Sequence, residues 1–155
     1  MTLEKKIAHL LISKHQTLSI AESCTGGLLS HRLTNIPGSS AFFHFGLIVY
    51  ANKAKCKLLK INEKILITYG AVSPQTARAM AKNVRKILKS DIGIAITGIA
   101  GPSGAAKNKP VGLVYIALNT QNKEICKKFN FKGTRASIKQ QSSTKALNLI
   151  GNLFS

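Results

Sequence analysis

The sequence predicts a three-layer α/β/α sandwich built on a mixed, mostly parallel sheet, in a single domain covering residues 1–155. Three observations support this prediction. Segments with helical periodicity alternate with short apolar runs typical of buried strands, which is the pattern of α/β folds. A short polar turn separates the last two strand-like runs and indicates one antiparallel hairpin. A chain of 155 residues is long enough to bury one core, and no linker or internal repeat divides it.

The first half of the chain alternates helix and strand patterns around one glycine-rich turn. Apolar side chains at helical spacing indicate an amphipathic helix at the start. The helix that follows the glycine-rich turn must end before Pro37, because proline cannot continue it. The next apolar run, ending near Tyr50, is expected to be a largely buried strand, and Asn52 is expected to cap the helix after it. The elements expected here are helices over 3–14, 28–36, 52–60 and 61–70 and strands over 17–21 and 42–51.

The second half begins with the strongest helix signal of the chain. Ser73 is a good N-cap, and Pro74 occupies the first helical position, where its missing N–H costs nothing. An apolar run bounded by glycines then has the pattern of a central strand covered on both faces. Gln121 and Asn122 form the hairpin turn between the last two strands. The elements expected here are helices over 74–88 and 134–154 and strands over 91–97, 111–119 and 124–131.

The charge balance is strongly basic, with 23 Lys and Arg against 5 Asp and Glu and a formal net charge of +18. Such a field attracts nucleic acid at low salt. Nearly all of the positive charge is lysine, without interleaved aromatics, whereas base reading and stacking favour arginine and aromatic residues. Specific nucleic-acid binding is therefore disfavoured without being excluded. The few carboxylates also argue against paired-carboxylate chemistry and an oxygen-ligand metal site, so we expect neither a metal nor another cofactor.

The cysteines and the apolar runs bear on the compartment. Cys24, Cys56 and Cys126 are odd in number and far apart, which argues against a disulfide framework and a zinc site. No apolar run reaches the roughly 18 residues of a membrane span. The start of the chain has no export signal pattern. We therefore expect a cytoplasmic protein without membrane contact.

The stretch that organises the chain is residues 21–28, Ala-Glu-Ser-Cys-Thr-Gly-Gly-Leu, which joins a strand to a helix. Unpaired N–H groups and the positive end of the helix dipole favour an anionic or carbonyl-bearing ligand there. The alternative is a capped helix start with Ser23 or Thr25 as N-cap. A second glycine-rich loop, residues 97–104, follows the central strand but matches no complete phosphate-binding fingerprint.

Six motifs in order carry a family resemblance. They are residues 21–27, 37–40, 50–55, 70–73, 97–102 and 109–112. Together they resemble the CinA C-terminal domain family over about residues 3–153. The resemblance implies a three-layer α/β/α domain that forms dimers or larger homo-oligomers. It also implies an amidohydrolase that converts nicotinamide mononucleotide and water into nicotinic acid mononucleotide and ammonia.

The resemblance also implies site residues. A serine and a lysine can supply nucleophile and base if burial or neighbouring positive charge keeps the lysine partly neutral. Ser40 is the favoured nucleophile, because a loop hydroxyl is freer to reach the substrate, and Ser23 is the alternative. Tyr50 would orient Lys55 or relay its proton. The implied catalytic residues are Ser40, Ser23, Lys55 and Tyr50, and the implied substrate-binding residues are Thr25, Gly26, Gly27, Thr97, Gly98, Gly101 and the phosphate-binding Arg135.

The sequence departs from the family pattern at two places, and two other functions remain as alternative hypotheses. Lys53 stands where the family usually has glutamate, and Ala105 and Ala106 stiffen a loop that normally carries glycine. A non-catalytic module that binds an acidic partner or nucleic acid would also suit the charge, since CinA-type proteins are linked by name to competence and DNA damage. An amidase acting on another nucleotide or small amide is the third hypothesis.

Overall fold

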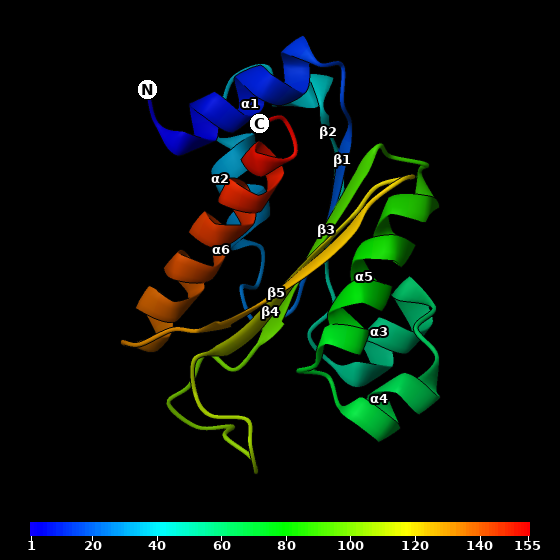
Figure 1. The fold of residues 1–155 in the computed structure, drawn as a ribbon, viewed down its shortest axis with the longest axis vertical. Helices are drawn as coiled ribbons and strands as arrows, with labels where there is room; N and C mark the ends of the chain where they lie inside the picture. The colour runs from blue at the N-terminus through cyan, green and yellow to red at the C-terminus, as the bar shows by residue number, and fades with distance from the viewer.

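A five-stranded sheet with helices on both faces makes up the computed structural model, which describes residues 1–155 (Figure 1). The elements are helices α1 (Leu3–Ser13), α2 (Leu28–Thr34), α3 (Asn52–Leu59), α4 (Glu63–Tyr69), α5 (Pro74–Ile87) and α6 (Arg135–Asn152), the short 3-10 helix η1 (Ser39–Ala41), and strands β1 (Leu18–Glu22), β2 (Phe43–Ile48), β3 (Ile92–Gly98), β4 (Leu113–Asn119) and β5 (Glu124–Asn130). In Figure 1, α1, α2 and α6 lie on one side of the sheet and α3, α4 and α5 on the other. This is the three-layer α/β/α arrangement that the sequence predicts.

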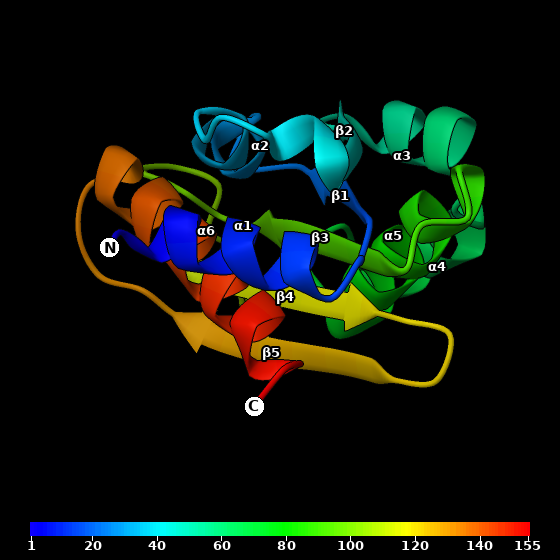
Figure 2. The ribbon, with the colours of Figure 1, turned by 90° about the horizontal axis from the view of Figure 1, so that it is seen from above.

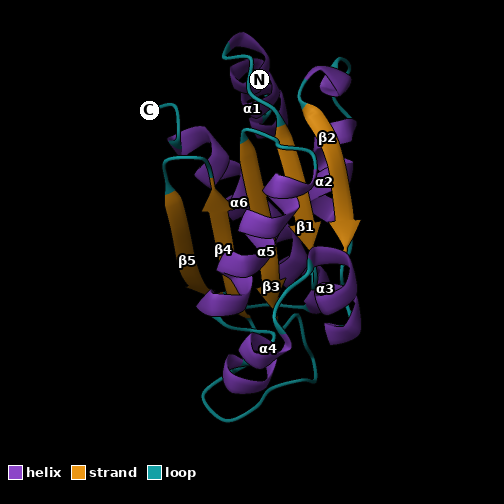
Figure 3. Ribbon diagram, turned by 90° about the vertical axis from the view of Figure 1, so that its right-hand side faces the viewer, coloured by secondary structure: helices purple, strands orange, loops and turns teal.

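The strand order is β2-β1-β3-β4-β5. β1 pairs in parallel with both β2 and β3, whereas β4 runs antiparallel to both of its neighbours, so four of the five strands point the same way (Figure 3). β4 and β5 form the predicted hairpin, which Figure 2 shows in yellow and orange. Glu22 lies opposite both Ile48 and Ile96. The residues that follow β1, β2 and β3 therefore meet at one edge of the sheet, where open α/β sheets place their ligands.

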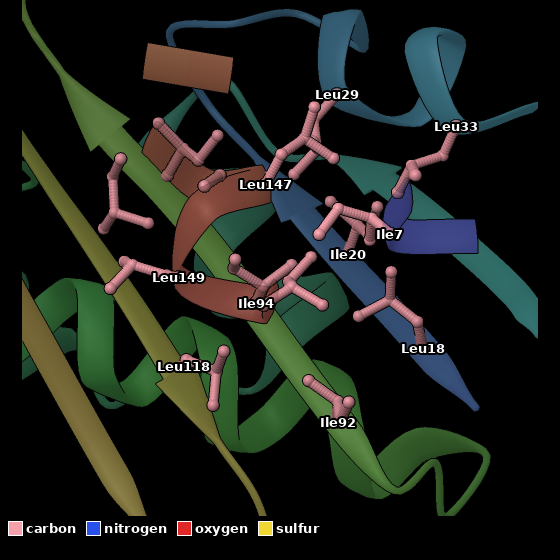
Figure 4. Close-up of a cluster of buried hydrophobic side chains, with 14 of the residues drawn as sticks. Ile7, Leu18, Ile20, Leu29, Leu33, Ile92, Ile94, Leu118, Leu147 and Leu149 are labelled. Carbon is pink, nitrogen blue, oxygen red and sulfur yellow. The ribbon is translucent and has the colours of Figure 1, made fainter. Parts of the chain in front are cut away.

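The sheet has a hydrophobic core on each face. On one face, Ile20 and Ile94 of the central strands pack under Leu29 of α2 and Leu147 of α6 (Figure 4). The opposite face carries small side chains, Ala21, Ala95 and Ala117, which let α5 lie close to the strands. Burial on both faces explains why β3 is apolar almost throughout, as expected for a central strand. β1 is equally buried, and its two polar residues, Ser19 and Glu22, are both hydrogen-bonded.

β2 differs from its prediction as a largely buried strand. It covers only six residues, and its side chains alternate between half-buried and exposed. The reason is its place at the edge of the sheet, where it pairs with β1 alone. Ile48 and Tyr50, at and just beyond its end, are 55% and 58% exposed. The apolar run therefore predicted the strand correctly, but it did not predict how deeply the strand is buried.

The helix ends follow the capping signals of the sequence, with one exception. The hydroxyl of Ser73 accepts from the Thr76 N–H at the start of α5, and Pro74 is the first helical residue, as predicted. Asn52 is the first residue of α3 and not its cap, since the N-cap is Ala51 without a side-chain hydrogen bond. None of the helices is both long and apolar enough to cross a membrane.

Candidate active site

The turn between β1 and α2 is fixed by a buried carboxylate. Glu22, 1% exposed, accepts from the Thr25 hydroxyl at 2.6 Å, the Leu29 N–H at 3.0 Å, and the Ser30 N–H and hydroxyl at 2.9 and 2.8 Å. The N-cap residue is Gly27, with φ of 103°. The N-terminus of α2 therefore already holds an internal anion. The alternative with Ser23 or Thr25 as N-cap is therefore wrong, whereas the ligand site predicted at this turn stays a prediction.

Ser23 follows β1 directly and faces Lys55 of α3. The Lys55 Nζ lies 3.0 Å from the Ser23 Oγ, 2.9 Å from the Val49 carbonyl oxygen and 2.9 Å from the Tyr50 carbonyl oxygen. Although lysine side chains are almost never fully buried, Lys55 is only 1% exposed. The parallel pairing of β1 with β2 brings the serine and the lysine together, because each follows the carboxyl end of its strand.

Burial of Lys55 shifts its protonation equilibrium toward the neutral amine. Burial lowers the pKa of Lys55 to about 8, against the weaker opposing influence of the Cys24 and Cys56 thiols. Burial is the cause, and the neighbouring lysines of α3 are not. A neutral amine has two N–H donors and one lone pair. The ammonium form donates to the Ser23 Oγ and to both carbonyls. Once it has lost a proton, the two N–H groups stay with the Val49 and Tyr50 carbonyls, which can only accept, and the lone pair is left to face the Ser23 hydroxyl. That is the orientation of a general base.

A cavity of about 330 Å³ opens beside this pair. Its volume falls in the range typical of small-molecule sites. The walls come from the turn after β1, the segment after β2, the α4–α5 loop, the glycine-rich loop after β3 and the start of α6. The lining residues are Ser23, Cys24, Tyr50, Lys55, Ala71, Val72, Thr97, Gly98, Ile99, Ala100, Gly101, Ser103, Gly104 and Arg135. None of them is acidic.

Arg135 joins two walls of the cavity. Its guanidinium donates to the Gly101 carbonyl oxygen and, at 2.9 Å, to the Tyr50 hydroxyl. Tyr50 therefore contacts Lys55 through its main-chain carbonyl and Arg135 through its hydroxyl. In this structure the tyrosine orients the lysine by its backbone, and its phenol is directed toward the arginine.

The remaining residues that the resemblance implied fall into two groups. Thr97, Gly98 and Gly101 line the cavity, and the Thr97 hydroxyl donates to the Ala71 carbonyl at 2.8 Å, which ties β3 to the α4–α5 loop. A side chain on Gly98 would collide with Val114. By contrast, the predicted substrate-binding residues Thr25, Gly26 and Gly27 do not line this cavity.

Ser40 is not part of the site within one chain. It lies exposed in η1, which precedes β2, so it belongs to the amino-terminal edge of the sheet. The Leu18 N–H bonds to the Phe42 carbonyl oxygen at that edge. The length of β1, roughly 15 Å at about 3.3 Å per residue, separates Ser40 from Ser23. The geometry of the chain thus does not support Ser40 as the nucleophile. In a parallel pair, residues that precede one strand lie at the other end of the sheet from residues that follow its neighbour.

Some residues of the site were not foreseen from the sequence. The Val49 carbonyl had no sequence signal, because a main-chain acceptor is independent of residue type. Cys24, by contrast, stands out in the sequence as the one cysteine beside the glycine-rich turn, where a thiol nucleophile would need a lowered pKa. It lines the cavity, but burial raises the pKa of its thiol to about 12, so it stays protonated and is no competitor to Ser23 as nucleophile. No group of three His, Cys, Asp or Glu side chains is placed to hold a metal ion.

The arrangement can support covalent acyl transfer. Ser23 has a base within hydrogen-bond distance, which is the geometry of an activated nucleophile. The N–H groups of Cys24 and Thr25 have no backbone acceptor, and they directly follow the serine in the strand-to-helix turn. In other hydrolases with a nucleophile at such a turn, the N–H of the next residue helps to hold the oxyanion.

This combination of a mixed α/β/α sandwich with a serine and a lysine at the carboxyl edge of its parallel strands defines the class of the domain. The chain belongs to the CinA C-terminal domain family, whose model matches residues 1–154. It is 50% identical over 149 residues to a protein of Moorella thermoacetica whose name marks it as competence-damage inducible, and 47% identical over 150 residues to a CinA-like protein of Syntrophus aciditrophicus. Each alignment covers 96% of this chain but 36% of the relative, so the chain spans about a third of their length.

Solved structures agree on the fold. The competence/damage inducible protein CihA of Agrobacterium tumefaciens superposes with a TM-score of 0.93 at 35% identity, covering 100% of this chain and 98% of that one. A CinA superfamily protein of Klebsiella pneumoniae gives a TM-score of 0.94 at 30% identity, covering 97% and 94%. The family and fold that the six motifs indicated are therefore confirmed.

Proposed function

We propose that this protein is an amidohydrolase that converts nicotinamide mononucleotide and water into nicotinic acid mononucleotide and ammonia. The observation that carries the proposal is the contact of 3.0 Å between the Ser23 Oγ and the Nζ of a buried lysine with lowered pKa, Lys55. A titratable group so perturbed within a cavity is a common mark of a catalytic site.

In the proposed reaction Ser23 attacks the amide carbonyl carbon, and its proton passes to the Lys55 Nζ. The resulting oxyanion accepts hydrogen bonds from main-chain N–H groups of the turn that begins at Cys24. The carbon–nitrogen bond then breaks as Lys55 returns the proton to the leaving nitrogen, which departs as ammonia. Water attacks the Ser23 ester, again giving its proton to Lys55, and the carboxylic acid product leaves while the serine regains its hydrogen.

Ammonia release from nicotinamide mononucleotide tests the proposal. The wild-type protein should release ammonia in equal amount to nicotinic acid mononucleotide, and Ser23→Ala should lose at least roughly a thousandfold of the rate, since the nucleophile and its base act as a unit. A wild-type rate no higher than that of Ser23→Ala would contradict the proposal. A panel of other nucleotide and small amides, run in parallel, would identify a related amidase with another substrate.

A non-catalytic role is the second candidate. The net charge of +18 favours it, because only one basic side chain, Arg32, is paired with a carboxylate, that of Glu4, and the others are left to attract an acidic partner. Retention of duplex DNA at physiological salt by a protein without amidase activity would favour it. The homo-oligomer and the cytoplasmic location stay predictions.

A further inference from the structure

Two of the six family motifs, residues 70–73 and 109–112, have no role in the proposed hydrolytic steps. The structure brings them together beside the cavity. The second motif ends the long loop between β3 and β4, which Figure 3 shows beyond the carboxyl ends of β1, β2 and β3 and next to α4. Lys109 of this loop donates from its Nζ to the Tyr69 carbonyl oxygen at 2.6 Å. Tyr69 is the last residue of α4, where the helix dipole favours a cation.

The contact depends on a glycine at the end of α4. Gly70 is the C-cap of α4, and its φ of 81° and ψ of 169° lie in a region that is accessible to glycine and strained for other residues. A methyl group built on Gly70 would lie 2.8 Å from the Lys109 Nζ and would crowd the ammonium. The half-buried side chain of Lys109 therefore lies against main chain that carries no side chain of its own.

Lys109 holds the β3–β4 loop by a contact that no other residue of the loop makes. Residues 106 and 109 pair through two main-chain hydrogen bonds of 2.9 Å, so residues 106–109 form a tight turn. Among residues 102–110, Lys109 alone is hydrogen-bonded to α4 or to the α4–α5 loop. Ser103 and Gly104, which precede the turn, line the cavity. Lys109 thus ties one wall of the cavity to the end of α4.

The segment that follows Gly70 forms a second wall. Ala71 and Val72 line the cavity. The Ala71 carbonyl oxygen accepts from the Thr97 hydroxyl at 2.8 Å, and the Gly70 carbonyl oxygen accepts from the Ser73 hydroxyl at 2.9 Å. These bonds fix the segment to β3 and to the start of α5, which makes it a firm anchor for the loop.

We infer that Lys109 is a positioning residue that latches the β3–β4 loop to the end of α4 and so holds two walls of the substrate cavity at a fixed separation. This inference rests on the proposed function for the identity of the substrate. Lys109 does not line the cavity, so it acts on the substrate through the residues of the two walls. A loop that is already in place when the substrate arrives loses less conformational entropy on binding.

The kinetic test compares Lys109→Met, which keeps an apolar stem and removes the charge, with Lys109→Arg and Lys107→Met. Lys107 is the matched control, since it is exposed in the same loop and lies outside the contact with Tyr69. Lys109→Met should raise KM for nicotinamide mononucleotide by roughly tenfold, as expected for one hydrogen bond from a charged group, with little change in kcat. Lys109→Arg should stay within about threefold of the wild-type KM, because a guanidinium can donate to the same carbonyl, and Lys107→Met within about twofold. A variant that was only less well folded would instead lose kcat and keep its KM.

Limited digestion with trypsin measures the latch without catalysis. Cleavage after the exposed Lys107 requires the loop to open, and position 109 adds no site of its own, because trypsin does not cleave before Pro110. Lys109→Met should speed cleavage after Lys107 by roughly tenfold, and Lys109→Arg should remain near wild type. Cleavage after Lys132, which is exposed outside the loop, is the internal reference.

The two tests separate the latch from the proposed function. Equal KM in Lys109→Met and Lys107→Met would overturn the positioning role even if ammonia is released. Equal cleavage after Lys107 in Lys109→Met and the wild type would overturn the latch itself. Faster cleavage in Lys109→Met without ammonia release from any of the proteins would support the latch and contradict the proposed hydrolysis.

Discussion

The protonation of Lys55 should control the rate of the proposed reaction. The reactive form is the neutral amine, and with a pKa of about 8 about a tenth of the enzyme carries it at pH 7. A lysine with the ordinary pKa of 10.5 would be neutral in only about 0.03% of molecules at that pH. Raising the pH from 7 to 9 should therefore increase kcat/KM by about tenfold, with a midpoint near 8. The substrate phosphate is already ionised across this range.

The assay is ammonia release from nicotinamide mononucleotide at constant ionic strength between pH 6 and 9.5. Lys55→Arg is the decisive variant, because a guanidinium stays charged and cannot accept the serine proton. Its rate should fall by roughly 10²- to 10⁴-fold, the usual contribution of a general base. Lys57→Arg, an exposed lysine of the same helix, is the control and should behave as wild type. A flat profile between pH 7 and 9, or an active Lys55→Arg, would refute the role of Lys55 as base.

Three further predictions concern the nucleophile, the turn and stability. Ser40→Ala should keep the wild-type rate of ammonia release. A loss comparable to that of Ser23→Ala would contradict the exclusion of Ser40 and would mean that Ser40 of a second copy of the chain reaches the site. Glu22→Gln should lower the free energy of unfolding, measured with urea, by about 2–4 kcal/mol, because the buried carboxylate accepts four hydrogen bonds. The lowered pKa of Lys55 means that the unfolded chain binds the extra proton above pH 8, so this residue adds stability as pH rises. Between pH 7 and 9 the wild type should gain about 1.4 kcal/mol relative to Lys55→Met, and an unchanged or falling difference would argue against a depressed pKa.

The parts of the fold that the sequence predicts well are those whose local and global preferences agree. β3 and α5 are examples, since an apolar run between glycines and a Ser-Pro start each have one good structural interpretation. β2 shows the opposite case. Its apolar residues are typical of a buried strand, but its burial depends on strand order, which no short stretch of sequence specifies.

The site divides in the same way. The pairing of Ser23 with Lys55 follows from two parallel strands that end at one edge, and the family resemblance drew attention to both residues. Ser40 belongs to one of the six family motifs, but it precedes β2 instead of following it. The presence of a residue in a motif does not tell at which end of the strands it lies.

The position of β2 at the rim of the sheet also has a consequence for how activity would be lost. The serine and the lysine come from different strands, and the outer strand is held along only one side. Transient fraying of that rim would separate base from nucleophile while the central strands stay intact. In mild denaturant, the rate of ammonia release should therefore fall at a lower denaturant concentration than the circular dichroism signal of global unfolding. Turnover would then report on partial opening of the sheet.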